Sequence, residues 1–411
     1  MPESRTSIPS CPHFGSCGGC QLQHLTYPAQ LHDKASLLRT LLEVTGLALP
    51  KLQLHPSSPF AYRNRIRFTL AEVDGQFHAG YLIPIPPEPS NREPRASNLA
   101  FLPITECPIA APILWRATET FLALLNQDTS TWLRNSHQLP DQLELFTTAD
   151  ESRLQLTLYL RTAAKSLPNK LTADFHAFCD TLRTRVPELI GAEIALLPTL
   201  SKQRSRRTEQ PRPGPTWGIP GLNYTVSSLQ PVTDNLQPAT SYWVPRGAFF
   251  QVNRFLLPEL LALVTNSRTG YLAFDLYAGV GLFSRALAAH FAQVAAVEIA
   301  EPAATALAST RLTNLRAIKA TTLDFLSSAV LQRDRPDLIV LDPPRSGAGC
   351  KVCALLARIA APTLIYVSCS PETLPADLIT LTASGYTLAE THLFDLFPQT
   401  THIETVAILT R

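Results

Sequence analysis

Three motifs in the last third of the chain place reactive side chains beside apolar runs. Asp342 begins the motif Asp342-Pro-Pro-Arg345 after the run 338–341, Cys369 follows the run 364–368, and Glu404 precedes the run 405–409. Two prolines fix the backbone after Asp342, so its carboxylate is held rigidly just past a strand. A cysteine and a carboxylate in one cleft indicate covalent catalysis, with the thiolate as nucleophile and the carboxylate as a separate proton acceptor.

Each motif also has a purely structural interpretation. Asp342 could begin a stiff turn, Cys369 could be a buried free cysteine of the common kind, and Glu404 could lie on the surface at the start of a strand. We expect the helix that follows Cys369 to favour its thiolate through the positive end of the helix dipole.

The elements that must position these motifs alternate along the chain. From residue 246, apolar strands alternate with helical segments, which predicts an α/β domain with a doubly wound, mostly parallel sheet and ligands at the carboxyl ends of its strands. Asp342 and Cys369 therefore face the same crevice. The expected strands are Leu272–Leu276, Val294–Ile299, Leu338–Leu341, Leu364–Ser368 and Thr405–Leu409.

A candidate cofactor loop follows the first of these strands. Gly279 and Gly281 open a helix, but Ser284 stands where a dinucleotide fingerprint has a third Gly or Ala, so a dinucleotide is disfavoured. Glu298 lies at the end of the next strand, where a carboxylate can bind ribose hydroxyls. Together these features fit S-adenosylmethionine, which has a ribose but no phosphate. The alternative is a plain strand-to-helix turn.

The first 245 residues have a different pattern. Apolar residues from Leu31 to Leu42 recur at helical spacing, with Gly46 as a C-terminal cap. Residues 62–70 and 77–82 predict two strands joined by a hairpin turn at Asp74-Gly75. Further alternating leucines over 154–160 and a helix over 171–186 indicate a strand-rich α+β domain.

Two basic segments of this domain have two interpretations each. Period two places Arg63, Arg65 and Arg67 on one face of the first strand, opposite the apolar residues. The loop Lys202–Arg207 is also basic. Both segments are either solvated surface or contacts to the phosphates of a nucleic acid.

Three cysteines cluster near the N-terminus. Cys11, Cys17 and Cys20 have the spacing Cys-x5-Cys-x2-Cys, and Cys107 is a candidate fourth ligand. In a reducing compartment such a set indicates a metal site rather than disulfides, and the spacing leaves zinc and an iron–sulfur cluster both open. The pair Cys350-x2-Cys353 resembles a redox motif, but we interpret it as incidental because it opens a helix.

Composition and charge limit the remaining possibilities. With 411 residues, of which 45% are hydrophobic and 17% charged, the chain is expected to fold into two or three domains. Its net charge of +2 neither requires nor excludes a polyanionic partner. Without a long apolar run or a secretory leader, we expect a cytoplasmic protein that does not contact the membrane.

The chain resembles the RNA uracil-5 methyltransferase family almost from end to end. The block from Cys11 to His24 is similar to the cysteine signature of the family, Cys107 matches its fourth ligand, and six further motifs follow in the same order. These motifs are Tyr62–Arg65, Phe249–Asn253, Asp275–Gly281, Asp342–Arg345, Ser368–Leu374 and Phe397–Glu404.

The resemblance implies an S-adenosylmethionine-dependent RNA methyltransferase. Cys369 would add to carbon 6 of a uracil, which makes carbon 5 nucleophilic enough to take the methyl group, and Glu404 would then remove the carbon 5 proton. The base must be unpaired or flipped out to reach such a pocket. The family also implies contacts between the cofactor and four residues: Gln251, Tyr277, Glu298 and Asp342.

The resemblance further implies a 4Fe-4S cluster and a three-part organisation. Cys11, Cys17, Cys20 and Cys107 would hold the cluster, which would help to shape an RNA-binding surface. The expected segments are an iron–sulfur segment with a helix (1–57), a central strand-rich RNA-binding domain (58–245) and a Rossmann-like methyltransferase domain (246–411). The helix near 31–45 would pack on the catalytic domain.

The chain departs from the family pattern at a few positions. Only ten residues precede Cys11, so the N-terminal β-barrel RNA-binding module of many members is expected to be absent. Ala376 stands where the family usually has Arg, and Leu282 where it often has Asn.

The RNA substrate and the reaction have alternatives. We favour 23S ribosomal RNA over tRNA, and a monomer without an obligate protein partner. An RNA cytosine-5 methyltransferase would require a further cysteine in the loop that here reads Asp342–Arg345. A non-catalytic iron–sulfur RNA-binding protein is the alternative from another class.

Overall fold

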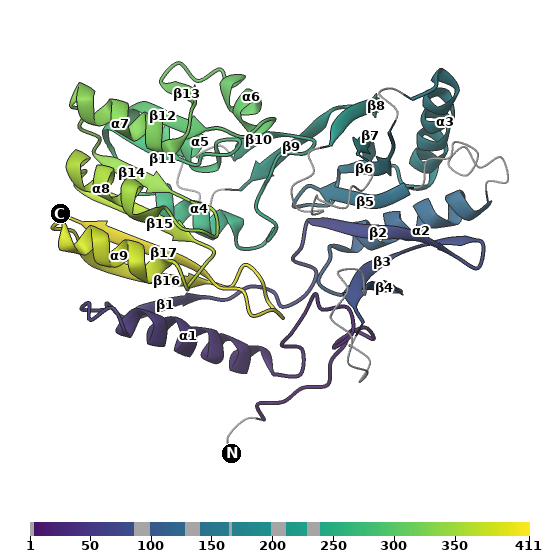
Figure 1. The fold of residues 1–411 in the computed structure, drawn as a ribbon, viewed down its shortest axis with the longest axis horizontal. Coiled ribbons are helices and arrows are strands. Elements are labelled where there is room, and N and C mark those ends of the chain that lie inside the picture. The colour runs from purple at the N-terminus through teal and green to yellow at the C-terminus, as the bar shows by residue number, and fades with distance from the viewer. Residues whose placement is uncertain (1–3, 86–98, 128–139, 164–166, 199–210, 228–238) are drawn as a thin grey trace, which may run out of the picture. The chain divides into compact units, whose positions relative to one another are not determined.

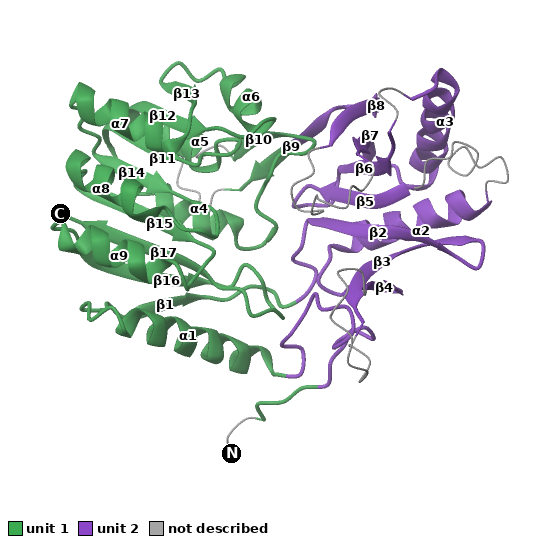
Figure 2. Ribbon diagram, in the orientation of Figure 1, with its two compact units in different colours: residues 1–7, 25–59, 223–411 green, residues 8–24, 60–222 purple. Residues whose placement is uncertain are grey.

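The chain forms two compact units. The computed structural model describes residues 4–85, 99–127, 140–163, 167–198, 211–227 and 239–411. Unit 1 comprises residues 1–7, 25–59 and 223–411, and unit 2 comprises residues 8–24 and 60–222 (Figure 2). The expected first segment, 1–57, is therefore divided between the two units.

An eight-stranded sheet forms the centre of unit 1 (Figure 1). All neighbouring strands run parallel except β17, which is antiparallel to both of its neighbours. This confirms the mostly parallel sheet. The strand order is β1 (Leu52–His55), β16 (Thr387–Phe394), β17 (Glu404–Thr410), β15 (Thr363–Ser368), β14 (Leu338–Leu341), β11 (Gly270–Leu276), β12 (Phe291–Glu298) and β13 (Leu315–Lys319).

Helices cover both faces of this sheet. Phe274 and Leu276 belong to a core shared with α1, α7, α8 and α9, so the side chain of Asp275 between them points to the opposite face. There it accepts a hydrogen bond from the backbone N–H of Ser284 in α5. The sheet is thus doubly wound. The helices of unit 1 are α1 (Tyr27–Glu43), α4 (Leu257–Thr265), α5 (Leu282–Leu287), α6 (Ala303–Ala308), α7 (Thr322–Gln332), α8 (Gly349–Ile359) and α9 (Leu374–Ala383).

The N-terminal helix α1 packs on the sheet of unit 1, as expected. Its residues Ala35, Leu38 and Leu42 lie on one helical face and join the core formed by the strands and by α7 to α9. The helix starts four residues earlier than the apolar spacing predicts, and Gly46 has a φ of +69° just beyond its end. The following strand β1 pairs with β16, so this N-terminal segment extends the sheet.

The described residues of unit 2 form a seven-stranded sheet and two helices. The helices α2 (Pro112–Gln127) and α3 (Asn169–Arg185) bury their apolar residues in one core with the strands, which confirms a strand-rich α+β unit. The strand order is β4 (Leu99–Pro103), β3 (Gln76–Pro84), β2 (Arg65–Val73), β5 (Pro140–Thr147), β6 (Leu154–Arg161), β7 (Leu189–Leu197) and β8 (Arg212–Gly218). Strands β9 (Gly221–Val226) and β10 (Thr240–Pro245) form a separate two-stranded sheet.

The hairpin between β2 and β3 forms where the sequence predicts it. Asp74 and Gly75 both have positive φ values, +50° and +78°, as a two-residue turn of the primed type requires. The basic loop Lys202–Arg207 lies outside the described residues. Within the described part of the chain, no helix is both long and apolar enough to cross a membrane.

Candidate functional site

The carboxyl end of the unit 1 sheet brings Cys369 and Glu404 together. Strands β15 and β17 are antiparallel and pair Ser368 with Thr405, so Cys369, directly after β15, lies near Glu404, the first residue of β17. Cys369 is partly exposed, whereas Glu404 is only 2% exposed. A partly accessible thiol thus lies beside a buried carboxyl group, and the surface interpretation of Glu404 is wrong.

Asp342 lies at the same edge. It follows β14, whose last residue Leu341 pairs with Tyr366 of β15 and with Leu276 of β11. The carboxyl group of Asp342 interacts electrostatically with Cys369 and Glu404. Asp342 and Cys369 therefore lie close together at one edge of the unit 1 sheet.

Asp342 raises the proton affinity of Glu404, and both carboxyl groups raise that of Cys369. Burial raises the pKa of Glu404 well above its usual value, and the nearby Asp342 raises it further. Burial also raises the pKa of Asp342 to about 7. Arg345, on the proline loop, acts in the opposite direction on Glu404 and Cys369, and it is a charged neighbour that the motif alone did not single out.

The expected stabilisation of the Cys369 thiolate is wrong. Burial raises the pKa of Cys369 to about 11, and Glu404 and Asp342 add to the increase. The helix α9 begins only at Leu374, five residues after Cys369. Cys369 is a thiol at neutral pH and must lose its proton before it can attack.

The loop between β11 and α5 is closed by Glu298 at the end of β12. One carboxylate oxygen of Glu298 accepts from the N–H of Gly279 at 2.9 Å, and the other accepts from the N–H groups of Ile299 and Ala300 at 2.7 and 2.6 Å. A carboxylate has about four acceptor sites, so capacity remains for a ligand hydroxyl. Gly279 has a φ of +56° and no atom within 4 Å of the position of a Cβ, which leaves open space above the loop.

The other two predicted cofactor residues outside the proline loop are Tyr277, at the end of β11, and Gln251, before α4. Tyr277 directly follows β11 with a φ of +62°, and its hydroxyl group bonds to Thr322 at the start of α7. Gln251 is buried before α4. The neighbouring Asn253 accepts from the N–H groups of Phe255 and Leu256 and donates to the carbonyl oxygen of Leu396.

Asp275 on β11 binds the start of α5, the helix that follows the candidate cofactor loop. Its carboxylate accepts from both the N–H and the hydroxyl group of Ser284, and it is 1% exposed. Burial raises its pKa to about 7. Its protonated form is therefore favoured in the folded state relative to the unfolded chain.

We expect Asp275→Asn to change the pH dependence of stability. Because the folded-state pKa is above the unfolded value of about 4, the contribution of the protonated form is fully present below pH 4 and is lost as the pH rises to about 7. Asparagine does not titrate, so the variant does not lose this contribution. The difference in unfolding free energy between variant and wild type should therefore shift in favour of the variant by up to a few kcal/mol from pH 5 to pH 8. Urea unfolding at both pH values measures the difference; equal effects at the two values would contradict the assignment.

Sequence reasoning missed Asp377, which fixes the loop after Asp342. Its carboxylate accepts from the N–H groups of Ala348 and Gly349 and from the hydroxyl group of Tyr366 at 2.7 Å. These bonds anchor the start of α8 to β15 and α9. Asp377 follows Ala376, so the unusual residue at 376 leaves this anchor in place.

The four candidate metal ligands all belong to unit 2. Cys11, Cys17, Cys20 and Cys107 are partly buried and interact electrostatically with one another. Burial raises the pKa of Cys20 to about 11 and that of Cys107 to about 12. Among the described residues, however, no group of three or more His, Cys, Asp or Glu side chains converges closely enough to hold a metal ion. The predicted metal site is thus not confirmed by the geometry.

Two of the arginines on β2 have partners within unit 2. The guanidinium of Arg65 lies 4.0 Å from the centre of the Phe146 ring. Arg67 forms an ion pair with Glu144 and donates to the hydroxyl group of Tyr159 at 2.7 Å. The structural interpretation of these two side chains is therefore favoured over free phosphate contacts.

Comparisons with known proteins agree on one enzyme class. A family model described as tRNA (Uracil-5-)-methyltransferase matches residues 231–411. The whole chain is 29% identical to the 23S rRNA (uracil(1939)-C(5))-methyltransferase RlmD of Chromohalobacter salexigens and covers 77% of it. An uncharacterized RNA methyltransferase of Listeria innocua is 28% identical, with 99% of this chain and 85% of that protein aligned.

A solved structure shares the fold. The tRNA (uracil-54, C5)-methyltransferase of Pyrococcus abyssi, in complex with S-adenosyl-L-homocysteine, superposes with a TM-score of 0.66 at 21% sequence identity. The match covers 96% of this chain and 86% of that chain.

The fold, the residues gathered at the carboxyl end of the sheet and these relatives define the class: the chain is an S-adenosylmethionine-dependent RNA methyltransferase. The family model over residues 231–411 and the relatives named as uracil-5 methyltransferases support the RNA uracil-5 methyltransferase family, in agreement with the resemblance based on the motifs.

Proposed function

We propose that the protein methylates carbon 5 of one uridine in 23S ribosomal RNA through a covalent enzyme–RNA adduct. The observation that supports this most strongly is the closeness of Cys369, directly after β15, to Glu404, at the start of β17, and to Asp342. The rRNA target rests on the full-length similarity to an enzyme named as a 23S rRNA methyltransferase. A tRNA substrate is the second candidate, because the solved structure with the same fold is named as a tRNA methyltransferase.

Cys369 acts first in this proposal. Its sulfur adds to carbon 6 of the uracil, the carbon 5–carbon 6 double bond opens, and the electron pair moves onto carbon 5 and the carbon 4 oxygen. Because the thiol is protonated in the free protein, a nearby carboxylate has to accept its proton when the RNA binds. Asp342, with a pKa of about 7, is suited to accept a proton near neutral pH.

When bound, S-adenosylmethionine would supply the methyl group that carbon 5 takes up, and S-adenosylhomocysteine would leave with the electron pair of the broken sulfur–methyl bond. Gln251, before α4, would hold the cofactor together with Tyr277, Glu298 and Asp342, at the ends of β11, β12 and β14. The free acceptor capacity of Glu298 fits a ribose, and the open space above Gly279 leaves room for it.

Glu404 completes the reaction. Its carboxylate takes the proton from carbon 5, the electrons of that C–H bond restore the double bond, and the C–S bond breaks with its electron pair on Cys369. The raised pKa of Glu404 makes its ionised form a stronger base than an exposed carboxylate, and the nearby Arg345 favours that ionised form. The buried position also keeps bulk water from competing for the proton.

The donor set in unit 2 has the chemistry that an iron–sulfur cluster needs. Four thiols interact electrostatically within unit 2, and cysteine thiolates are the usual ligands of such clusters. Cys11, Cys17, Cys20 and Cys107 would hold the cluster, and we assign it a structural part in the RNA-binding surface of unit 2.

Replacing a cluster ligand should remove iron. We expect Cys107→Ser, purified without oxygen, to lose most of the iron, acid-labile sulfide and broad visible absorbance of the wild type. The control is Cys350→Ser, because Cys350 is exposed on α8 in unit 1. Wild-type protein with one zinc ion and no sulfide would contradict the cluster assignment.

Nucleoside mass spectrometry identifies the substrate. Ribosomal RNA and tRNA are isolated separately from cells with and without the gene, and 5-methyluridine is quantified in each pool. Loss of about one 5-methyluridine per 23S rRNA supports the proposal, and loss from tRNA alone establishes the second candidate. Loss of 5-methylcytidine would favour the cytosine alternative, and no loss in a strain without a related enzyme would favour a non-catalytic RNA-binding protein.

A further inference from the structure

The loop that leads into Glu404 is unusually long for its position. Strands β16 and β17 are antiparallel neighbours, and Phe394 at the end of one pairs with Glu404 at the start of the other. Hairpin loops usually have two to five residues, but here residues 395–403 connect the strands. Such a loop needs anchors outside the hairpin if it is to hold Glu404 in one orientation.

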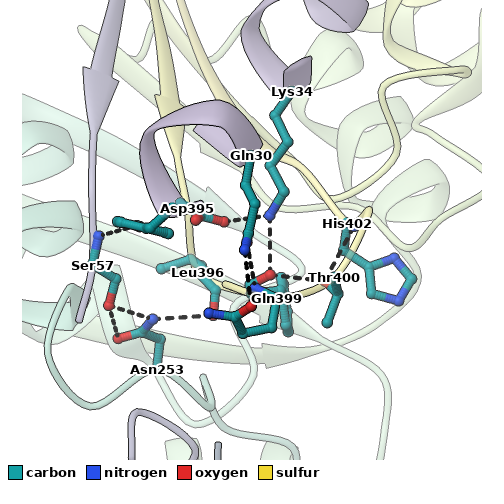
Figure 3. Close-up of polar contacts among 11 residues, drawn as sticks. Gln30, Lys34, Ser57, Asn253, Asp395, Leu396, Gln399, Thr400 and His402 are labelled. Carbon is teal, nitrogen blue, oxygen red and sulfur yellow. Dashed lines mark hydrogen bonds and ion pairs between the residues drawn. The ribbon is translucent and has the colours of Figure 1, made fainter. Parts of the chain in front are cut away.

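The anchors come from polar residues on the buried face of α1 (Figure 3). The ammonium group of Lys34 donates to Asp395 at 2.5 Å and to the carbonyl oxygen of Phe397 at 3.0 Å. The side chains of Lys34 and Asp395 are 3% and 0% exposed. A buried ion pair contributes little net stability compared with apolar residues of the same size, so its retention calls for another explanation.

A second anchor is one helical turn earlier on α1. The amide of Gln30 donates to the side-chain oxygen of Gln399 at 2.9 Å and accepts from the backbone N–H of Gln399 at 3.0 Å. Gln399 has a φ of +68°, a left-handed conformation that non-glycine residues rarely adopt. The paired amides hold it there.

Further bonds connect this loop to the cofactor side of the site. Asn253, two residues after Gln251, donates to the carbonyl oxygen of Leu396 at 3.1 Å and bonds to Ser57 after β1. The N–H of Asp395 donates to the carbonyl oxygen of His55. The loop is thus held from α1, from β1 and from the segment that contains Gln251.

We propose that Lys34 and Gln30 are positioning residues for Glu404: they hold the 395–403 loop so that the carboxylate faces the carbon 5 proton of the adduct. This inference rests on the proposed function. Under this inference, α1 influences the removal of the carbon 5 proton and the release of the product, although none of its side chains takes part in the reaction itself. Methyl transfer, which precedes proton removal, does not need this anchor.

Separate kinetic measurements of the two steps test the inference. For Lys34→Met we expect the single-turnover rate of methyl transfer to stay within about threefold of wild type. Steady-state turnover should fall by roughly 10- to 100-fold, the size expected for a misplaced catalytic group. Methylated RNA should accumulate on Cys369 as an adduct that survives denaturing electrophoresis. Arg39→Met, on the exposed face of α1, is the matched control and should behave as wild type.

A second variant distinguishes a loss of folding from a misplaced Glu404. Lys34→Met/Asp395→Leu leaves no unpaired charge in the interior, so it should fold while still lacking the link from α1 to the loop. It should also accumulate the adduct. A smaller active fraction with no adduct, in both variants, would overturn the inference.

The proposed function fails in a different way. If wild-type protein neither methylates RNA nor forms an adduct, the proposed function is wrong, and the positioning role of Lys34 and Gln30 is wrong with it. If Glu404→Gln accumulates the adduct while both Lys34 variants release product at the wild-type rate, only the positioning role is wrong.

Discussion

Cys369→Ala is expected to lower the rate of 5-methyluridine formation by roughly 10⁴-fold or more, the size typical for loss of a catalytic nucleophile. Without the sulfur, carbon 5 of the uracil stays too weak a nucleophile to take the methyl group. The variant should fold normally, because the side chain is small and only partly buried. Transfer of a labelled methyl group to RNA transcripts measures the rate.

RNA that contains 5-fluorouridine gives an independent measurement. Fluorine replaces the proton at carbon 5, so the adduct cannot be resolved and remains attached to wild-type protein in denaturing gels. Cys369→Ala should form none, whereas Cys350→Ala, altered at an exposed cysteine of α8, should form as much as wild type. A labelled adduct in Cys369→Ala would show that another residue is the nucleophile.

Glu404→Gln should separate the two halves of the reaction. The amide cannot remove the carbon 5 proton, so we expect steady-state turnover to fall by about 10²- to 10⁴-fold. The first methyl transfer should still take place, and methylated RNA should remain attached to Cys369. The change also removes a titratable group that raises the pKa of Cys369, so addition to the uracil should not be slower.

The measurement is a burst experiment with labelled methyl donor. A burst of one methyl group per enzyme, followed by slow turnover and a stable adduct, supports Glu404 as the proton acceptor. Glu43→Gln, at the exposed end of α1, is the control. Equal losses in the burst and in the later turnover would instead assign Glu404 to binding or to addition.

Local patterns were sufficient to predict the strands around the site. The apolar run Leu338–Leu341 is strand β14 with the predicted bounds. Strands β1, β13 and β16 were not predicted, because their short or interrupted apolar patterns form strands only through pairing with distant neighbours. The parallel sheet could thus be inferred from its central strands but not from its edges.

The sequence predicted which residues form the site better than it predicted their protonation states. Cys369, Asp342 and Glu404 were found from their places beside strands. The direction in which the pKa of Cys369 changes, however, depends on its burial and on how close the two carboxyl groups lie after folding. Lys34 was missed because lysine on a helix usually faces solvent. The available signal was its place directly before Ala35, on the same helical face as Leu38.

The pairing of β1 with β16 has a consequence for how the protein is made. Leu52 pairs with Thr391, about 340 residues further along the chain, and the whole of residues 60–222 in unit 2 lies between them. At 5–20 residues per second, the first strand waits roughly 20 to 70 s on the ribosome for its partner. Unit 2 can fold in that time, whereas α1 and β1 stay exposed until β16 and β17 emerge. A nascent chain therefore gains methyltransferase activity only at the end of translation.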